Sequence, residues 1–258
     1  MCRIAGIAGF PEQVERNKDI VQRMCTIQQH GGPDDEGIYL SDNGSVVLGN
    51  RRLSLLDLSP AGKMPLVYQH RYVVTYNGEL YNYKELKTIL NGLGHAFQTE
   101  TDTEVLAAAF SQWREGAFSR LSGMFAFAIW DSVEEVLFLV RDAVGIKPLY
   151  YSLKDQQLVF ASEVRAISQT GFHNEINHDW PVFFMAYGHL PEPITTLKDV
   201  QPLPKGFFLK YTMGSKHTSI QSYKHFSFSN QSFSKKEAVD QIRNLLMDAV
   251  EKHLLSHA

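Results

Sequence analysis

Apolar and polar positions alternate along the N-terminal third of the chain in a way that predicts short strands around one helix. Residues 2–9 are small or β-branched and predict a buried strand, whereas apolar side chains at helical spacing predict a helix over Glu12–Gln29. The Gly-Gly-Pro-Asp-Asp run at 31–35 ends that helix. Beyond it, the pattern predicts strands over Gly37–Leu40, Ser45–Leu48, Arg52–Leu56 and Tyr72–Tyr76, a loop over 58–65 and a turn at Asn77-Gly78.

The middle of the chain predicts two helices followed by four strands. A helix over Tyr83–Leu93 ends at Gly94, and Thr101-Asp102-Thr103-Glu104 forms a capping box that opens a helix through Trp113. The predicted strands, of which the first two are apolar enough to be buried on both faces, are Met124–Trp130, Glu135–Val140, Leu149–Ser152 and Leu158–Ala161. Because the links between strands are short, we expect an α+β fold with two antiparallel sheets faced by helices.

The pattern changes near residue 212. Residues 212–233 are rich in Ser, His, Gln and Asn and predict a linker. Ser234 and Glu237 then form a second capping box, and apolar residues at helical spacing predict an amphipathic helix within 234–258. Such a helix docks on its own domain or on a further domain, and the sequence leaves both alternatives open.

Composition narrows the class of protein. The 258 residues are 44% hydrophobic and 21% charged with a net charge of −3, which is typical of a globular protein and gives no basic stripe for nucleic acid. Two cysteines, Cys2 and Cys25, are too few for a disulfide framework and fit a reducing compartment. No secretory signal pattern is present, and the longest apolar run, Met124–Trp130, is too short to span a bilayer. We therefore expect a cytoplasmic protein that binds neither nucleic acid nor membranes.

Cys2 is the first candidate for chemistry. Its small side chain permits removal of Met1, which would leave a thiol and a free α-amine on one residue, an arrangement that serves acyl transfer. The alternative is a small residue that merely opens a buried strand. The ten histidines show no metal-ligand spacing, so we expect no metal site.

A series of motifs, in order over about four fifths of the chain, resembles the class II glutamine amidotransferases and most closely the glutamine-hydrolysing asparagine synthetases. These motifs are Met1-Cys2-x-Ile4-Ala5-Gly6, the runs 32–37, 48–54 and 76–83, Asp102-Thr103-Glu104, the runs 123–131 and 141–151, Phe160-Ala161-Ser162-Glu163, Gly188-x-Leu190-Pro191 and Leu203-Pro204-x-Gly206.

The resemblance implies a four-layer αββα sandwich of the N-terminal-nucleophile hydrolase type. It implies a glutaminase domain over 2–211, a linker over 212–233 and, over 234–258, the first helix of a truncated synthetase domain. The Ser-Gly-Gly-x-Asp-Ser loop that binds ATP in such synthetases does not occur in this sequence. We therefore expect no cofactor in this chain, and ATP and Mg in the missing synthetase domain.

The resemblance also implies the roles of seven site residues. Cys2 matches the nucleophile, and the side chain of Asn77 and the backbone N–H of Gly78 match the oxyanion hole. The positions that match glutamine contacts are Arg52 for the α-carboxylate, Glu79 and Asp102 for the α-ammonium, and Leu53 for a backbone contact. Simpler interpretations stay open: Asn-Gly as a hairpin turn, Arg51 and Arg52 as solvated charges, Asp102 as a first-turn carboxylate, and Leu53 as plain core.

Three residues depart from the family pattern near the predicted site. Arg3 replaces a glycine beside the nucleophile, Gly31 replaces an arginine, and Asn50 stands where a histidine is common. The arginine next to Cys2 could crowd the pocket or lower the pKa of the thiol. A further hypothesis is that Arg3 replaces the cation absent at position 31.

The leading hypothesis for function is hydrolysis of glutamine by Cys2 to glutamate and ammonia, for ATP-dependent amidation of aspartate to asparagine. One alternative is a catalytically decayed scaffold domain. Another is an asparagine-synthetase-like enzyme that amidates or cyclises a different carboxylate. The sequence also leaves a homodimer open.

Overall fold

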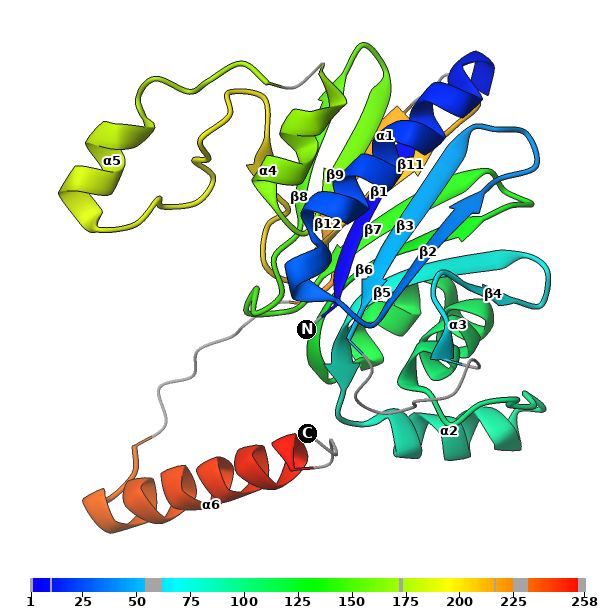
Figure 1. Cartoon of the computed structure of the whole chain (residues 1–258). Helices are drawn as coiled ribbons and strands as arrows, with labels where there is room; N and C mark the ends of the chain where they lie inside the picture. The colour runs from blue at the N-terminus through cyan, green and yellow to red at the C-terminus, as the bar shows by residue number, and fades with distance from the viewer. Residues whose placement is uncertain are drawn as a thin grey trace.

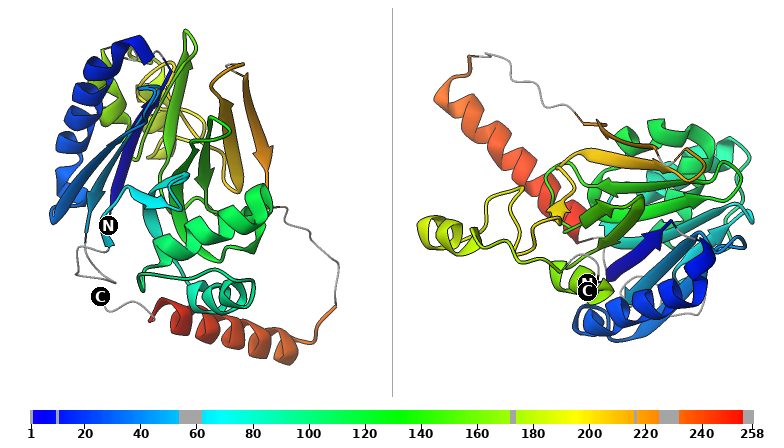
Figure 2. Two further views of the ribbon diagram at one scale, coloured as in Figure 1. Left: turned by 90° about the vertical axis from the view of Figure 1, so that its right-hand side faces the viewer. Right: turned by 90° about the horizontal axis from the view of Figure 1, so that it is seen from above.

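Two six-stranded antiparallel sheets, stacked face to face, form the centre of the computed structural model, which describes residues 2–9, 11–53, 62–171, 174–215, 217–224 and 232–254 (Figures 1 and 2). In spatial order, sheet A consists of β10 (Gln201–Pro202), β8 (Tyr150–Lys154), β9 (Gln157–Ala161), β1 (Arg3–Ala8), β3 (Val46–Arg52) and β2 (Asp35–Leu40). Sheet B consists of β12 (His217–Ser222), β11 (Phe207–Thr212), β7 (Val136–Arg141), β6 (Gly123–Asp131), β5 (Tyr72–Leu80) and β4 (Leu66–Tyr68).

Helices cover the outer face of each sheet. On sheet A, α1 (Val14–Ile27) and α4 (Val164–Ile167) pack on apolar residues of β1, β3 and β9. On sheet B, α2 (Tyr83–Gly92) and α3 (Asp102–Trp113) close a second apolar cluster. A third cluster fills the space between the sheets. The predicted α+β fold with four αββα layers is therefore confirmed. Short 3-10 helices are η1 (Pro11–Gln13), η2 (Gln29–Gly31), η4 (Arg114–Arg120) and η5 (Ser168–Thr170).

The predicted turn at Asn77-Gly78 is wrong. Strand β5 runs without a break to Leu80, and β6 pairs with it along its whole length, with Gly78 opposite Phe125. An Asn-Gly pair favours a hairpin only when the flanking strands pair with each other. Here both flanks belong to one strand, whose partner lies more than forty residues away in the sequence.

Strand β3 corrects a second prediction. The sequence predicts separate strands over Ser45–Leu48 and Arg52–Leu56, whereas a single strand covers Val46–Arg52 and is buried throughout. The polar residues at its end are in register with β1 on one side and β2 on the other, which keeps them in the ladder. Residues 54–61, and with them the end of the predicted strand Arg52–Leu56 and half of the predicted loop over 58–65, lie outside the described part of the chain.

Part of the region after residue 211 belongs to sheet B. The predicted linker over 212–233 is wrong for residues 217–222, because β12 pairs with β11 and places Ile220 opposite Leu209. The predicted C-terminal helix is confirmed as α6 (Lys235–His253), with both arms of its capping box present. No residue of α6 is buried.

An unpredicted helix, α5 (Trp180–Tyr187), projects from the body of the molecule on a long excursion between η5 and β10 (Figure 1). Like α6, it has no buried residue, although its sequence is mostly apolar. Within the described residues, none of the helices combines the length and the apolar character that crossing a membrane requires.

Candidate active site

Cys2 lies at the start of β1, the strand at the middle of sheet A, and beside the end of β3. The backbone N–H of Leu53 donates to Cys2 Sγ over 3.4 Å, and the thiol donates to the Leu53 carbonyl oxygen over 3.7 Å. Burial raises the pKa of the Cys2 thiol, against the opposing effects of the Leu53 N–H and the charge of Arg52. The thiol is therefore protonated near neutral pH, and attack by its sulfur needs a base. The predicted removal of Met1 concerns a residue outside the described ranges.

The backbone of Gly78 faces an edge of β5 that is covered by no strand in the described part of the chain. The opposite residue, Phe125, directs its N–H and its carbonyl toward Asp142, with N–O distances of 3.2 and 2.8 Å to that residue. Phe125 and Gly78 thus form a non-hydrogen-bonded pair, so the N–H of Gly78 points away from β6. Strand β4 pairs only with residues 72–74 of β5 and does not cover this edge. The direction of the Gly78 N–H therefore results from a strand edge and not from the predicted turn.

Asn77 carries an unpaired amide in the interior. Its side chain is 1% exposed, and among the described residues neither Oδ1 nor Nδ2 has a hydrogen-bond partner. Leaving a buried amide without partners costs about 1–3 kcal/mol per group, so native structures rarely retain one without a reason. An amide held in this state next to Gly78 is suited to donate to a ligand oxygen.

Two carboxylates, Glu79 of β5 and Asp102 of α3, lie at the end of β5. Asp102, the first residue of α3, is buried and accepts hydrogen bonds at Oδ2 from the Tyr76 hydroxyl (2.8 Å) and the Leu80 N–H (3.0 Å). Burial, with a contribution from the charge of Glu79, raises the pKa of Asp102 to about 6 although these bonds oppose the shift. A cationic ligand would lower this raised pKa, because it compensates the negative charges of Asp102 and Glu79. Asp102 also lies in the first turn of α3, as the simpler interpretation predicts. Its roles as a first-turn carboxylate and as a contact for the α-ammonium are therefore compatible.

Arg51 and Arg52 are neighbours on β3 but make different contacts, and neither is a solvated charge. Arg51 donates to the Gly32 carbonyl oxygen at 2.9 Å and to Glu36 at 2.6 Å, which commits it to sheet A. Arg52 is also buried, and its charge acts on the Cys2 thiol. Its guanidinium covers Gly62, where an added Cβ would lie 2.1 Å from Nη2. Successive residues of a strand point to opposite faces, which explains the division.

Lys147 is a neighbour of the site that sequence reasoning missed. Its side chain is 2% exposed. Burial lowers the pKa of Lys147, and the negative charges of Glu79 and of Cys2 in its thiolate form act against that shift, so the ammonium lies near both groups. The signal in the sequence was a lysine inside the quoted 141–151 motif, among residues that predict a buried segment.

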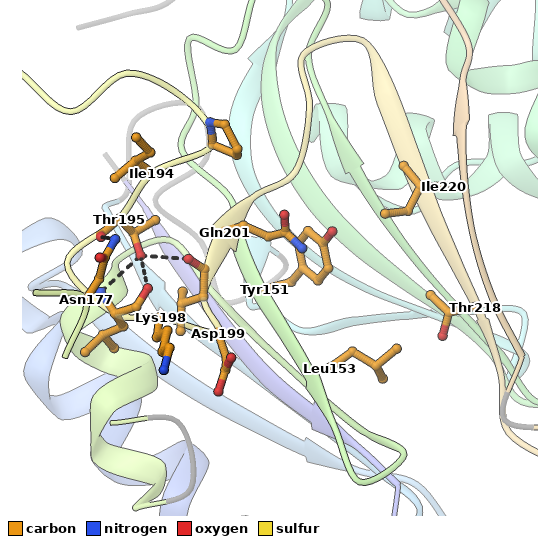
Figure 3. Close-up of a pocket in the computed structure, with 13 residues that line it drawn as sticks. Tyr151, Leu153, Asn177, Ile194, Thr195, Lys198, Asp199, Gln201, Thr218 and Ile220 are labelled. Carbon is orange, nitrogen blue, oxygen red and sulfur yellow. Dashed lines mark hydrogen bonds between the residues drawn. The ribbon is translucent and has the colours of Figure 1, made fainter. Parts of the chain in front are cut away.

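A separate surface pocket lies at the far edge of the two sheets (Figure 3). It has a volume of 780 Å³ between the loop around Thr195, strand β8 and strand β12, and it contains none of the predicted site residues. One polar group of its lining, the Thr195 hydroxyl, lies 2.8 and 2.7 Å from the carbonyl oxygens of Leu197 and Val200. This hydroxyl therefore has its hydrogen-bond partners within its own loop. Among the described residues, no three or more His, Cys, Asp or Glu side chains are grouped to hold a metal ion.

Four αββα layers around a thiol at the start of a central strand define the N-terminal-nucleophile hydrolase fold. Glutamine phosphoribosylpyrophosphate amidotransferase from Bacillus subtilis, solved with ADP and GMP, shares this fold with a TM-score of 0.65 at 20% identity, over 87% of this chain and 50% of that one. The family model for the glutamine amidotransferase domain matches residues 1–224. The chain belongs to this family.

Curated relatives are longer than this chain. A glutamine-hydrolysing asparagine synthetase of Bacillus subtilis is 34% identical over 99% of this chain and 40% of its own length. Asparagine synthetase B of Escherichia coli is 31% identical over 99% of this chain and 41% of its own length. The chain thus spans about 40% of the relatives that it matches.

Proposed function

We propose that this chain hydrolyses glutamine to glutamate and ammonia, with Cys2 as the nucleophile. The observation that carries the proposal is the buried amide of Asn77, which has no partner among the described residues and lies next to an N–H directed at a strand edge that β4 does not cover. Two such donors are what an oxyanion that forms on a carboxamide requires. A decayed scaffold gains nothing from an unpaired amide that lowers its stability.

The chemistry follows from the protonated thiol. Once Met1 is removed, the α-amine of Cys2 accepts the thiol proton while Sγ bonds to the carboxamide carbon of glutamine. The oxyanion is stabilised by Asn77 Nδ2 and the Gly78 N–H. The C–N bond then breaks, and the leaving nitrogen takes the proton from the α-ammonium and departs as ammonia. Water attacks the remaining thioester, which yields glutamate and restores the thiol.

Substrate orientation is assigned to the charged groups around Cys2. Arg52 pairs with the α-carboxylate of glutamine, a task suited to a rigid bidentate fork. Glu79 and Asp102 hold the α-ammonium, and the backbone of Leu53, which already contacts Sγ, completes the pocket. Lys147 adds a buried cation near the thiol, which favours the thiolate when sulfur becomes the leaving group.

For the longer protein we propose asparagine synthesis, in which the ammonia amidates an aspartate activated with ATP and Mg in the part that this chain does not span. In this proposal the glutaminase extends beyond the predicted boundary at residue 211 to include β12, and α6 begins the synthetase domain. The exposed apolar faces of α5 and α6 fit such a continuation. A different carboxylate acceptor stays open, as does a homodimer. A thiol nucleophile and two free cysteines suit the cytoplasm.

The test is intact mass before and after reaction with 6-diazo-5-oxo-norleucine, an electrophilic analogue of glutamine. A chain prepared to begin at Cys2 should gain one adduct, mapped to Cys2, and free glutamine should slow the reaction. Cys25 is the internal control, because burial raises the pKa of this thiol to about 12 and it should stay unmodified. No adduct at Cys2, or equal labelling of both cysteines, contradicts the proposal.

A further inference from the structure

The side chain of Arg3 lies across Gly31. A Cβ added at Gly31 would lie 2.6 Å from both Cγ and Cζ of Arg3 and 2.7 Å from Nε. Real Cβ atoms do not approach other atoms so closely, so a side chain at position 31 requires Arg3 to move. The two positions therefore share one volume, which only one of them can fill.

Arg3 joins the nucleophile to the end of β9. Its Nε donates to Glu163 Oε1 at 2.8 Å, and its Nη1 donates to the carbonyl oxygen of Cys2 itself at 3.0 Å. Arg165 and His30 also contact the Glu163 carboxylate, at 2.7 and 2.8 Å. Burial would raise the pKa of Glu163, but the hydrogen bonds from the arginines hold it below its ordinary value. The carboxylate is thus an ionised anchor for the Arg3 guanidinium.

Hydrogen bonds between β1 and the segment after β9 continue up to Glu163. The Ile4 N–H donates to the Ser162 hydroxyl at 3.0 Å, and the Ser162 N–H donates to the Ile4 carbonyl oxygen at 2.9 Å. One residue further on, the ion pair between Arg3 and Glu163 connects the same two segments. The Cys2 carbonyl oxygen, directly before β1, accepts a hydrogen bond from the same guanidinium, which orients the peptide plane directly after the nucleophile.

We propose that Arg3 is a positioning residue for Cys2, and that residues 3 and 31 are an exchanged pair in which position 3 supplies the cation that the resembling family carries at position 31. The inference rests on the proposed glutaminase function. Arg3 touches neither thiol nor substrate in this scheme. It holds the Cys2 carbonyl, so that the amine and the sulfur of Cys2 keep the relative orientation that proton transfer between them needs.

The experiment compares five variants of the chain that begins at Cys2: Arg3→Gly, Gly31→Arg, the double exchange, Arg165→Ala and Arg3→Lys. The readouts are kcat and KM for glutamine, the rate of Cys2 labelling by 6-diazo-5-oxo-norleucine, and the thermal midpoint. Arg3→Gly should lower kcat and the labelling rate by about tenfold or more with little change in KM, because a charge-assisted hydrogen bond that orients the nucleophile is lost.

Gly31→Arg alone should lose at least as much, because two guanidinium groups then compete for one volume. The double exchange should recover most of the loss, which a purely structural role of Arg3 does not predict. Arg165→Ala is the matched control, since it removes the other arginine on Glu163 without touching Cys2, and its rates should stay within about twofold. Arg3→Lys controls for misfolding. It keeps the charge but lacks the rigid guanidinium fork whose separate nitrogens contact Glu163 and Cys2, so it should lose activity without a lower thermal midpoint.

Equal or faster labelling of Arg3→Gly, or a double exchange no better than the worse single variant, overturns the inference and leaves the proposed function intact. If the parent chain itself is not labelled at Cys2, the proposed function fails, and the positioning role of Arg3 fails with it.

Discussion

Asn50 donates a hydrogen bond to the backbone of Tyr76, the residue directly before Asn77. Its Nδ2 donates to the Tyr76 carbonyl oxygen at 3.2 Å and to the Thr75 hydroxyl at 3.1 Å, which ties β3 of sheet A to β5 of sheet B. Asn50 is buried, and it stands where the resembling family commonly has a histidine. The departure therefore falls on a cross-link between the sheets rather than on a group that faces substrate, and it leaves the proposed oxyanion donors in place.

The two buried asparagines should respond in opposite ways to truncation. Asn77→Ala should lower kcat about 10²–10³-fold, the usual cost of one oxyanion donor. Its free energy of unfolding should not fall, because an unpaired buried amide is removed. Asn50→Ala should instead lower the free energy of unfolding by about 1–3 kcal/mol, since Tyr76 loses its partner. Glutaminase assays and urea titrations measure both effects, and full activity of Asn77→Ala contradicts the assignment.

Arg52 and Arg51 offer a second matched pair. Arg52→Lys should raise KM for glutamine about 10- to 100-fold with a smaller change in kcat, because a lysine cannot pair with a carboxylate through two parallel bonds. Arg51→Lys should mainly lower the thermal midpoint, because it weakens the contacts to Gly32 and Glu36. Steady-state kinetics and thermal melts of both variants distinguish the roles. A raised KM only in the Arg51 variant would reverse the assignment of the two residues.

Asp102 predicts the pH dependence of glutamine use. Its raised pKa of about 6 means that the carboxylate, the form that attracts the α-ammonium, is present above that pH and is lost as the pH falls through it. The value of kcat/KM should therefore decrease about tenfold per pH unit below 6 and level off above 7. Kinetics from pH 5 to 8 at constant ionic strength measure this. Asp102→Asn should have a low kcat/KM at every pH and should lose the decrease below pH 6. If the decrease survives the substitution, another group causes it.

The apolar face of α6 predicts self-association. Ile242, Leu245 and Leu246 are 58%, 68% and 62% exposed, and no residue of the helix is buried. Apolar patches of this kind favour contact with a second surface. Light scattering should show a mass that rises with protein concentration, and a chain that ends at residue 231 should lose this behaviour. A Leu245→Glu, Leu246→Lys variant keeps the helix and should also be monomeric, while a clean monomer of the parent chain counts against the prediction.

Local signals made most elements predictable. The Ser234–Glu237 capping box fixed the start of α6, and the two apolar runs over 124–140 predicted strands buried on both faces. At Thr101 only half of the box forms: the hydroxyl accepts from the Glu104 N–H, whereas the Glu104 side chain accepts from the N–H groups of Gln98 and Thr99. Even there, the start of the helix was correct.

The sequence by itself determined most of the helices and strands, because capping and periodicity act over a few residues. Through the resemblance it also determined the four-layer class and which residues belong to the proposed site, because motifs keep their order. Tertiary structure decided what those residues face. Asn77-Gly78 became a strand because β6 pairs with it, and Arg51 and Arg52 were separated by the alternation of β3. Lys147 joined the site and Arg3 came to lie on Gly31 through contacts between distant segments, which no local pattern encodes.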